Sequence, residues 1–168
     1  MDRREKLLNL VKRSKRPLSG TWLARKLGVS RQVIVQDVAL LRAHGEQVHS
    51  TPRGYLFSPS GQGGTVRDVL AVRHEPRKTG EELYVLVDRG ITVVDVVVEH
   101  PVYGELRGDL YLQSRRDVDL FLERVRKDKA PLLSVLTDGY HWHTVEAGRA
   151  DLIEEAKAEL ARRGFLVS

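Results

Sequence analysis

The sequence predicts an α/β protein of two domains, an N-terminal winged helix-turn-helix and a C-terminal α+β sandwich with a mainly antiparallel sheet. Three observations support this fold class. Residues 19–45 read as two helices around a tight turn, residues 58–64 have the small, polar composition of a linker, and residues 65–168 alternate strands with helices. We therefore place the domain limits at residues 1–57 and 65–168.

The N-terminal domain is predicted to begin with helices at residues 3–15 and 21–27, because their apolar residues recur at helical spacing. Gly28 then favours the tight turn that separates the second helix from the third. The inward residues of the first two helices are Leu7, Leu8, Val11, Leu23, Ala24 and Leu27.

The third helix carries a face that suits base recognition. Ser30 is placed to cap it, and Ile34, Val38 and Leu41 form the stripe that packs inward. Glutamine pairs with adenine, arginine with guanine, and small apolar groups contact the thymine methyl. The residues predicted to bind DNA from this helix are Ser30, Arg31, Gln32, Val35 and Gln36.

A short hairpin follows the third helix. Residues 47–50 and 54–57 are predicted strands, and the turn between them places Arg53 at its tip, where we expect it to bind DNA as well. The hairpin completes a winged helix. Some winged helices bind protein instead of nucleic acid, and the architecture alone leaves that alternative open.

The charge distribution favours double-stranded DNA as the partner. Residues 1–57 hold 12 Lys and Arg against 4 Asp and Glu, a net charge of +8, whereas residues 58–168 hold 16 against 19, a net charge of −3. A basic excess confined to the helix-turn-helix can drive binding to phosphates by counterion release.

Composition excludes several other classes. The chain has 168 residues and no cysteine, which excludes disulfides and thiolate metal sites. No apolar run approaches the ~20 residues of a membrane span, and the N-terminus is charged, so we expect a cytoplasmic protein with no membrane partner.

The C-terminal domain is predicted to follow the order β-α-β-β-α-β-α-β, with helices on one side of the sheet. Val118, Phe121, Leu122 and Val125 form one stripe of a helix capped by Ser114. The other predicted elements are strands at 65–74, 91–99, 103–112, 140–145 and 165–167, and helices at 80–89 and 149–163.

Histidines mark a candidate metal site in this domain. His141 and His143 lie two apart on a predicted strand, so both imidazoles are on one face. His74 and Glu82 could complete a set of three nitrogens and one carboxylate, which suits zinc, nickel, iron or manganese. Histidine pairs of this kind are often purely structural, and Glu82 could instead form a capping box with Thr79.

Longer stretches resemble known families. The run SGTWLARKLGVSRQVIVQDVALLRAHG with STPRGYLF resembles the winged helix of the biotin-repressor type. The segments RHEPRKTGEELYVLVDRG, VVVEHPVYGELRGDLYL, SRRDVDLF and PLLSVLTDGYHWHTV resemble the three-histidine (3H) domain. The combination is similar to that of the NiaR-type family of niacin-responsive transcription repressors, over nearly the whole chain.

This resemblance implies a repressor of NAD-biosynthesis and niacin-uptake genes, with nicotinic acid as corepressor. It also implies a divalent metal, nickel or zinc, at His74, Glu82, His141 and His143. For the effector we consider His100, Tyr103 and Trp142 as lining residues. A homodimer is expected, which would present two recognition helices to successive major grooves.

Two alternatives use the same four ligands. In the first, a repressor senses the metal itself. In the second, the C-terminal domain is a metal-dependent enzyme fused to a winged helix. We expect no enzyme, because the sequence contains no P-loop, no GRGRRGR-like ligase loop and no convincing Ser-His-Asp order.

Overall fold

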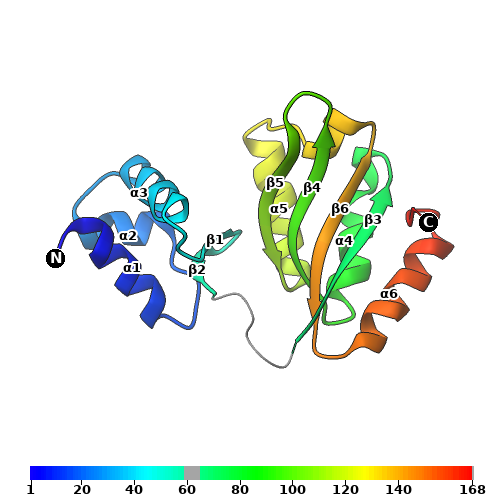
Figure 1. Cartoon of the computed structure of the whole chain (residues 1–168), viewed down its shortest axis with the longest axis horizontal. Helices are drawn as coiled ribbons and strands as arrows, with labels where there is room; N and C mark the ends of the chain where they lie inside the picture. The colour runs from blue at the N-terminus through cyan, green and yellow to red at the C-terminus, as the bar shows by residue number, and fades with distance from the viewer. Residues whose placement is uncertain (59–64, 168) are drawn as a thin grey trace. The chain divides into compact units, whose positions relative to one another are not determined.

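The computed structural model describes residues 1–58 and 65–167, and the chain folds into two compact units, Met1–Gln62 and Gly63–Ser168 (Figure 1). Apart from Ser58, the predicted linker 58–64 lies outside the described residues. The fold class predicted from the sequence is confirmed: a helix-turn-helix unit precedes an α+β unit with an antiparallel sheet.

The N-terminal unit is a winged helix. Its core consists of buried aliphatic side chains from all three helices and from the first strand. The two strands pair antiparallel, from Val48 opposite Phe57 to Thr51 opposite Gly54. The elements are α1 (Arg3–Arg13), α2 (Gly20–Leu27), α3 (Arg31–Ala43), β1 (Val48–Thr51) and β2 (Gly54–Phe57).

The turn between α2 and α3 forms as the sequence predicts. Gly28 adopts a left-handed conformation with φ of 69°, which a glycine takes without steric cost. The Ser30 hydroxyl accepts a hydrogen bond from the Val33 backbone N–H at 3.2 Å and so caps α3. Ile34, Val38 and Leu41 are buried, as expected for the inward stripe.

The sequence analysis did not predict the burial of Asp37, an acidic residue on the inner side of α3. Its side chain is 3% exposed and receives two hydrogen bonds from Arg3 of α1, Nε to Oδ2 at 2.7 Å and Nη2 to Oδ1 at 3.1 Å. A two-pronged arginine–carboxylate pair fixes direction as well as distance. It therefore ties the orientation of α3 to α1.

We expect the substitution Arg3→Gln to lower the melting temperature of the chain by several degrees, because it leaves the buried Asp37 carboxylate without its cationic partner. Lys6→Gln is the matched control, since Lys6 is an exposed cation of the same helix. Circular dichroism melts test the comparison. Equal melting temperatures for the two variants would contradict it.

The C-terminal unit is one four-stranded antiparallel sheet with strand order β3-β6-β4-β5. Its strands are β3 (Val66–Arg73), β4 (Thr92–His100), β5 (Gly104–Leu112) and β6 (Tyr140–Ala147). Its helices are α4 (Thr79–Val87), α5 (Arg115–Lys127) and α6 (Ala150–Arg162), with short 3-10 turns η1 (Pro76–Lys78) and η2 (Leu133–Thr137).

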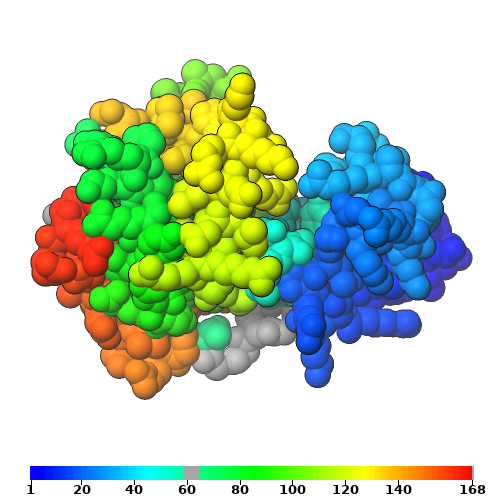
Figure 2. Space-filling view, turned by 180° about the vertical axis from the view of Figure 1, so that it is seen from behind, coloured from blue at the N-terminus to red at the C-terminus, as the bar shows by residue number. Residues whose placement is uncertain are grey.

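The three α-helices pack on one face of this sheet, as expected (Figures 1 and 2). Leu70 of β3, Val93 of β4 and Val145 of β6 meet Leu86 of α4 and Ile153 of α6 in a single core. None of the helices in the described residues is long and apolar enough to span a membrane.

Two local predictions for this unit were wrong. Residues 165–167 form no strand; Leu166 instead makes an isolated bridge to Val72. The capping box of Thr79 and Glu82 does not form either. Thr79 lies inside α4 and donates its hydroxyl to the Pro76 carbonyl at 2.7 Å, and Glu82 faces the histidines.

Candidate functional site

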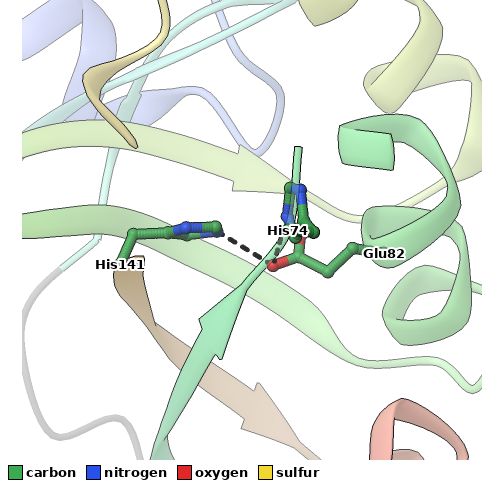
Figure 3. A group of neighbouring side chains, drawn as sticks. All are labelled: His74, Glu82 and His141. Carbon is green, nitrogen blue, oxygen red and sulfur yellow. Dashed lines mark hydrogen bonds and ion pairs between the residues drawn. The ribbon is translucent and has the colours of Figure 1, made fainter. Parts of the chain in front are cut away.

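Four side chains from three segments meet around one carboxylate oxygen: His74 after β3, Glu82 on α4, and His141 and His143 on β6. Glu82 Oε1 lies 3.0 Å from Nε2 of His141, 3.0 Å from Nε2 of His143 and 3.4 Å from Nε2 of His74. All four residues are buried. Figure 3 shows His74 and His141 approaching the same oxygen of Glu82 from different directions.

The periods of strand and helix explain this meeting. Alternation along β6 sends His141 and His143 to the same face of the sheet. Their partners on β3 are Val72 and Leu70, which belong to the core under the helices. That face is covered by α4, so Glu82 points from the helix onto the imidazoles.

Backbone carbonyls fix the orientation of each imidazole. Nδ1 of His74 lies 2.8 Å from the Glu75 carbonyl, Nδ1 of His141 lies 2.8 Å from the Gly139 carbonyl, and Nδ1 of His143 lies 2.7 Å from the Asp95 carbonyl. A carbonyl oxygen only accepts, so each Nδ1 must carry the proton and donate it. In the neutral rings, all three Nε2 lone pairs therefore face the carboxylate.

The donor atoms of the cluster are suited to a cation. Lone pairs on three nitrogens and a carboxylate repel one another, and three protonated imidazoles around one carboxylate would leave surplus positive charge in the interior. Within the described residues, the buried Nε2 of His74 has no hydrogen-bond partner. A divalent ion satisfies all of these atoms, and carbonyl-bound Nδ1–H groups are the usual outer support of metal-bound histidine.

The electrostatics of the cluster favour positive charge next to Glu82. Burial raises the pKa of Glu82, but the attraction of His143 and hydrogen bonds from the histidines outweigh burial and hold that pKa well below its usual value. Burial lowers the pKa of His143, and Glu82 reverses this, so the pKa of His143 is raised. The carboxylate is thus ionised and its surroundings favour positive charge.

The donor set fits a transition metal. One ligand atom each from His74, Glu82 and His141 lie within 4.8 Å of one another, and Nε2 of His143 contacts both carboxylate oxygens, at 3.0 and 3.3 Å. Three imidazole nitrogens with one carboxylate suit zinc, nickel or iron rather than calcium or magnesium. The structure therefore brings together all four residues predicted as ligands.

A tight turn before β6 supports the cluster. Gly139 has a φ of 87°, and a Cβ added to it would lie 2.6 Å from the His74 carbonyl oxygen. Its own carbonyl accepts the Nδ1–H of His141. Gly139 therefore holds two of the four residues of the cluster in place, His74 by close approach and His141 by a hydrogen bond.

A cavity of about 260 Å³ adjoins the histidines. His141 and His143 form part of its wall, and apolar side chains form most of the rest. Pockets for drug-sized ligands usually measure about 300–1,000 Å³, so this cavity suits a smaller molecule such as a single aromatic ring. Its apolar lining includes Leu83, Val96, Leu110, Phe121, Val125 and Leu133.

The structure does not bring the three residues considered for the effector to this cavity. Trp142 alternates with its neighbours and lies on the opposite face of the sheet, where it pairs with Ala71 and Val97. His100 ends β4, and its Nδ1 accepts hydrogen bonds from the backbone N–H groups of Val102 and Tyr103. The Tyr103 side chain is 74% exposed.

The residues predicted to bind DNA lie on the outside of the N-terminal unit. Arg31, Gln32, Val35 and Gln36 are exposed along α3, opposite its buried stripe, and Ser30 caps its first turn. Arg53 is exposed in the turn between β1 and β2. This leaves one polar helix face and a basic hairpin tip open to a partner.

Sequence reasoning missed the residues that support the cluster of three histidines and Glu82. Residue spacing predicts neither the contact of the Asp95 carbonyl with His143 nor the close packing of Gly139 against His74. One signal was available: the dipeptide Asp138-Gly139 directly precedes the histidine strand and is typical of a tight turn.

Comparisons with known proteins agree with both halves of the structure. Residues 67–168 match the 3H domain family, and residues 3–56 match an HTH domain family. The chain is 43% identical over 166 residues to the probable transcription repressor NiaR of Thermotoga maritima, covering 99% of this chain and 94% of that protein. It is 41% identical over 168 residues to the transcription repressor NadR of Bacillus subtilis, covering 99% and 93%.

Proposed function

The chain belongs to the family of the transcription repressors NiaR and NadR and is a DNA-binding repressor, and we propose that nicotinic acid and a divalent metal ion control its affinity for DNA. Its targets would be genes of NAD biosynthesis and niacin uptake. Regulation of transcription, not catalysis, is the activity that the relatives' names carry.

The observation that carries the metal is the convergence of three imidazoles on Glu82 Oε1, with each Nδ1–H held by a carbonyl. His74, Glu82, His141 and His143 would hold nickel or zinc. When bound, the ion would supply positive charge beside the cavity and could polarise a ligand there.

The size and apolar lining of the cavity support a small aromatic ring as the effector. Its apolar side chains, Phe121 and Leu133 among them, would pack against a pyridine ring and exclude water from it. Neither Arg nor Lys is among the residues that line the cavity. The counter-charge for a carboxylate would therefore come from the metal side, which links binding of nicotinate to the metal site.

Nicotinate acts as corepressor only if it binds the DNA-competent state more tightly than the other state. By linkage, operator DNA then tightens nicotinate binding by the same factor, typically about 5- to 150-fold. Calorimetric titration of nicotinate into the metal-loaded repressor, with and without operator duplex, measures this factor. Equal affinities in the two titrations would rule out the corepressor role.

DNA recognition would depend on the exposed face of α3. We expect Gln32→Ala or Gln36→Ala to weaken operator binding by about 1–3 kcal/mol and to relax the base preference at one position. Binding to random duplex should change little, because it depends on phosphate contacts. Competition binding against operators mutated one base pair at a time tests this, and uniform weakening across all sequences would contradict base contact.

A homodimer would provide two DNA-binding units for one operator. Two winged helices related by a twofold axis would place their α3 helices in successive major grooves, roughly 34 Å apart. The operator is then expected to be a near-palindrome.

A further inference from the structure

Five exposed cations on α5 and just beyond it make neither an ion pair nor a side-chain hydrogen bond within the described part of the chain. We call these residues the α5 basic face: Arg116, Arg124, Arg126, Lys127 and Lys129. Figure 2 shows the α5 segment, yellow-green to yellow, lying uncovered on the surface of the C-terminal unit.

The other cations of the C-terminal unit are close to acidic side chains. The unit contains sixteen Lys and Arg residues, and each of the eleven outside the α5 basic face lies within ion-pair distance of an acidic side chain. Arg115, at the start of the same helix, pairs with Asp88. The unpaired cations are thus gathered on one segment of a unit whose net charge is −3.

The helix dipole favours cations in the last turn of α5, where Arg124, Arg126 and Lys127 lie, but it does not account for Arg116 or Lys129. The inner side of α5 packs through Val118, and Phe121 and Val125 line the cavity beside the histidines. Arg124 and Lys127 lie three residues apart, where like charges on a helix repel each other. Asp119, Glu123 and Asp128 are the exposed acids between the cations, and none of them makes an ion pair in the described structure; Asp119 accepts a hydrogen bond from the Tyr84 hydroxyl.

We propose that the α5 basic face contacts the phosphate backbone of the operator duplex, in addition to the contacts of the winged helix. A polyanion is the partner that a row of unpaired arginines and lysines suits, and the chain is a DNA-binding repressor. Such contacts strengthen binding without reading sequence. The proposal rests on DNA binding by the N-terminal unit.

The test is the salt dependence of operator binding by the full-length chain. The variant Arg124→Gln/Lys127→Gln removes two cations of the α5 basic face. The control Arg77→Gln/Arg149→Gln removes two exposed cations that are paired, with Glu75 and Asp151. Net charge therefore falls equally in both proteins. A second test pair, Arg126→Gln/Lys129→Gln, checks the same face independently.

Each lost phosphate contact makes the plot of log K against log salt shallower by about 0.9. We expect each test pair to reduce the slope by up to about 1.8 and the control to keep the wild-type slope. The weakening should be the same whatever the base sequence beside the operator, because phosphate contacts do not read sequence. If both test pairs gave the same slope as the control, the proposed contact of the α5 basic face with DNA would be wrong. A flat plot for the wild type would instead remove DNA binding itself.

Discussion

Glu82→Gln is expected to lower the affinity of the C-terminal unit for its divalent metal by more than about 100-fold, beyond the loss usual for a residue that only supports a ligand. The carboxylate oxygen lies at the centre of the three Nε2 atoms, and a neutral amide of the same shape offers the ion no charge. Metal content after dialysis and calorimetric titration with nickel or zinc measure the loss.

Glu81→Gln is the control for this substitution. Glu81 lies next to Glu82 on α4, but its carboxylate faces outward and pairs with Lys78 and Arg163. That variant should keep its metal. If Glu82→Gln retained metal as fully as Glu81→Gln does, the four-residue centre would be refuted.

Gly139→Ala should destabilise the C-terminal unit by about 1–3 kcal/mol, because a residue with a Cβ is strained at a φ of 87°. The new Cβ would also lie 2.6 Å from the His74 carbonyl oxygen, so the chain must shift where His74 and His141 are held. We therefore also expect metal affinity to fall by about 10- to 100-fold.

Gly148→Ala provides the comparison for Gly139→Ala. Gly148 has no neighbour within 4 Å of an added Cβ, and its φ lies outside the left-handed range. Chemical denaturation with and without metal measures both effects of each substitution. Normal metal affinity in a destabilised Gly139→Ala protein would show that this turn supports the fold alone.

The fold was largely predictable because local patterns and packing agree. The apolar stripe of α3 and the caps Ser30 and Ser114 appear in the structure where the sequence places them. The last predicted strand failed because Phe165 and Leu166 follow α6 closely and meet β3 only through one bridge. Asp37 was missed because its partner Arg3 is 34 residues away.

The meeting of the four residues of the candidate site was also predictable. Strand alternation puts His141 and His143 on one face, and His74 and Glu82 were named as completing the set before the resemblance supported them. The residues around the site, including the cavity wall, were not predictable from the sequence. The cavity wall depends on how α5 and the segment around Leu133 pack over the sheet, which no spacing encodes. Alternation alone, however, places Trp142 away from the histidines.

The most direct test of the account is operator binding with metal and nicotinate varied independently. The metal-free and metal-loaded full-length proteins are each titrated with operator duplex, with and without nicotinate. The account predicts that nicotinate tightens operator binding at least about 5-fold in the metal-loaded protein and has no effect in the metal-free protein. Full tightening by metal alone, with no further effect of nicotinate, would contradict it and identify a metal sensor.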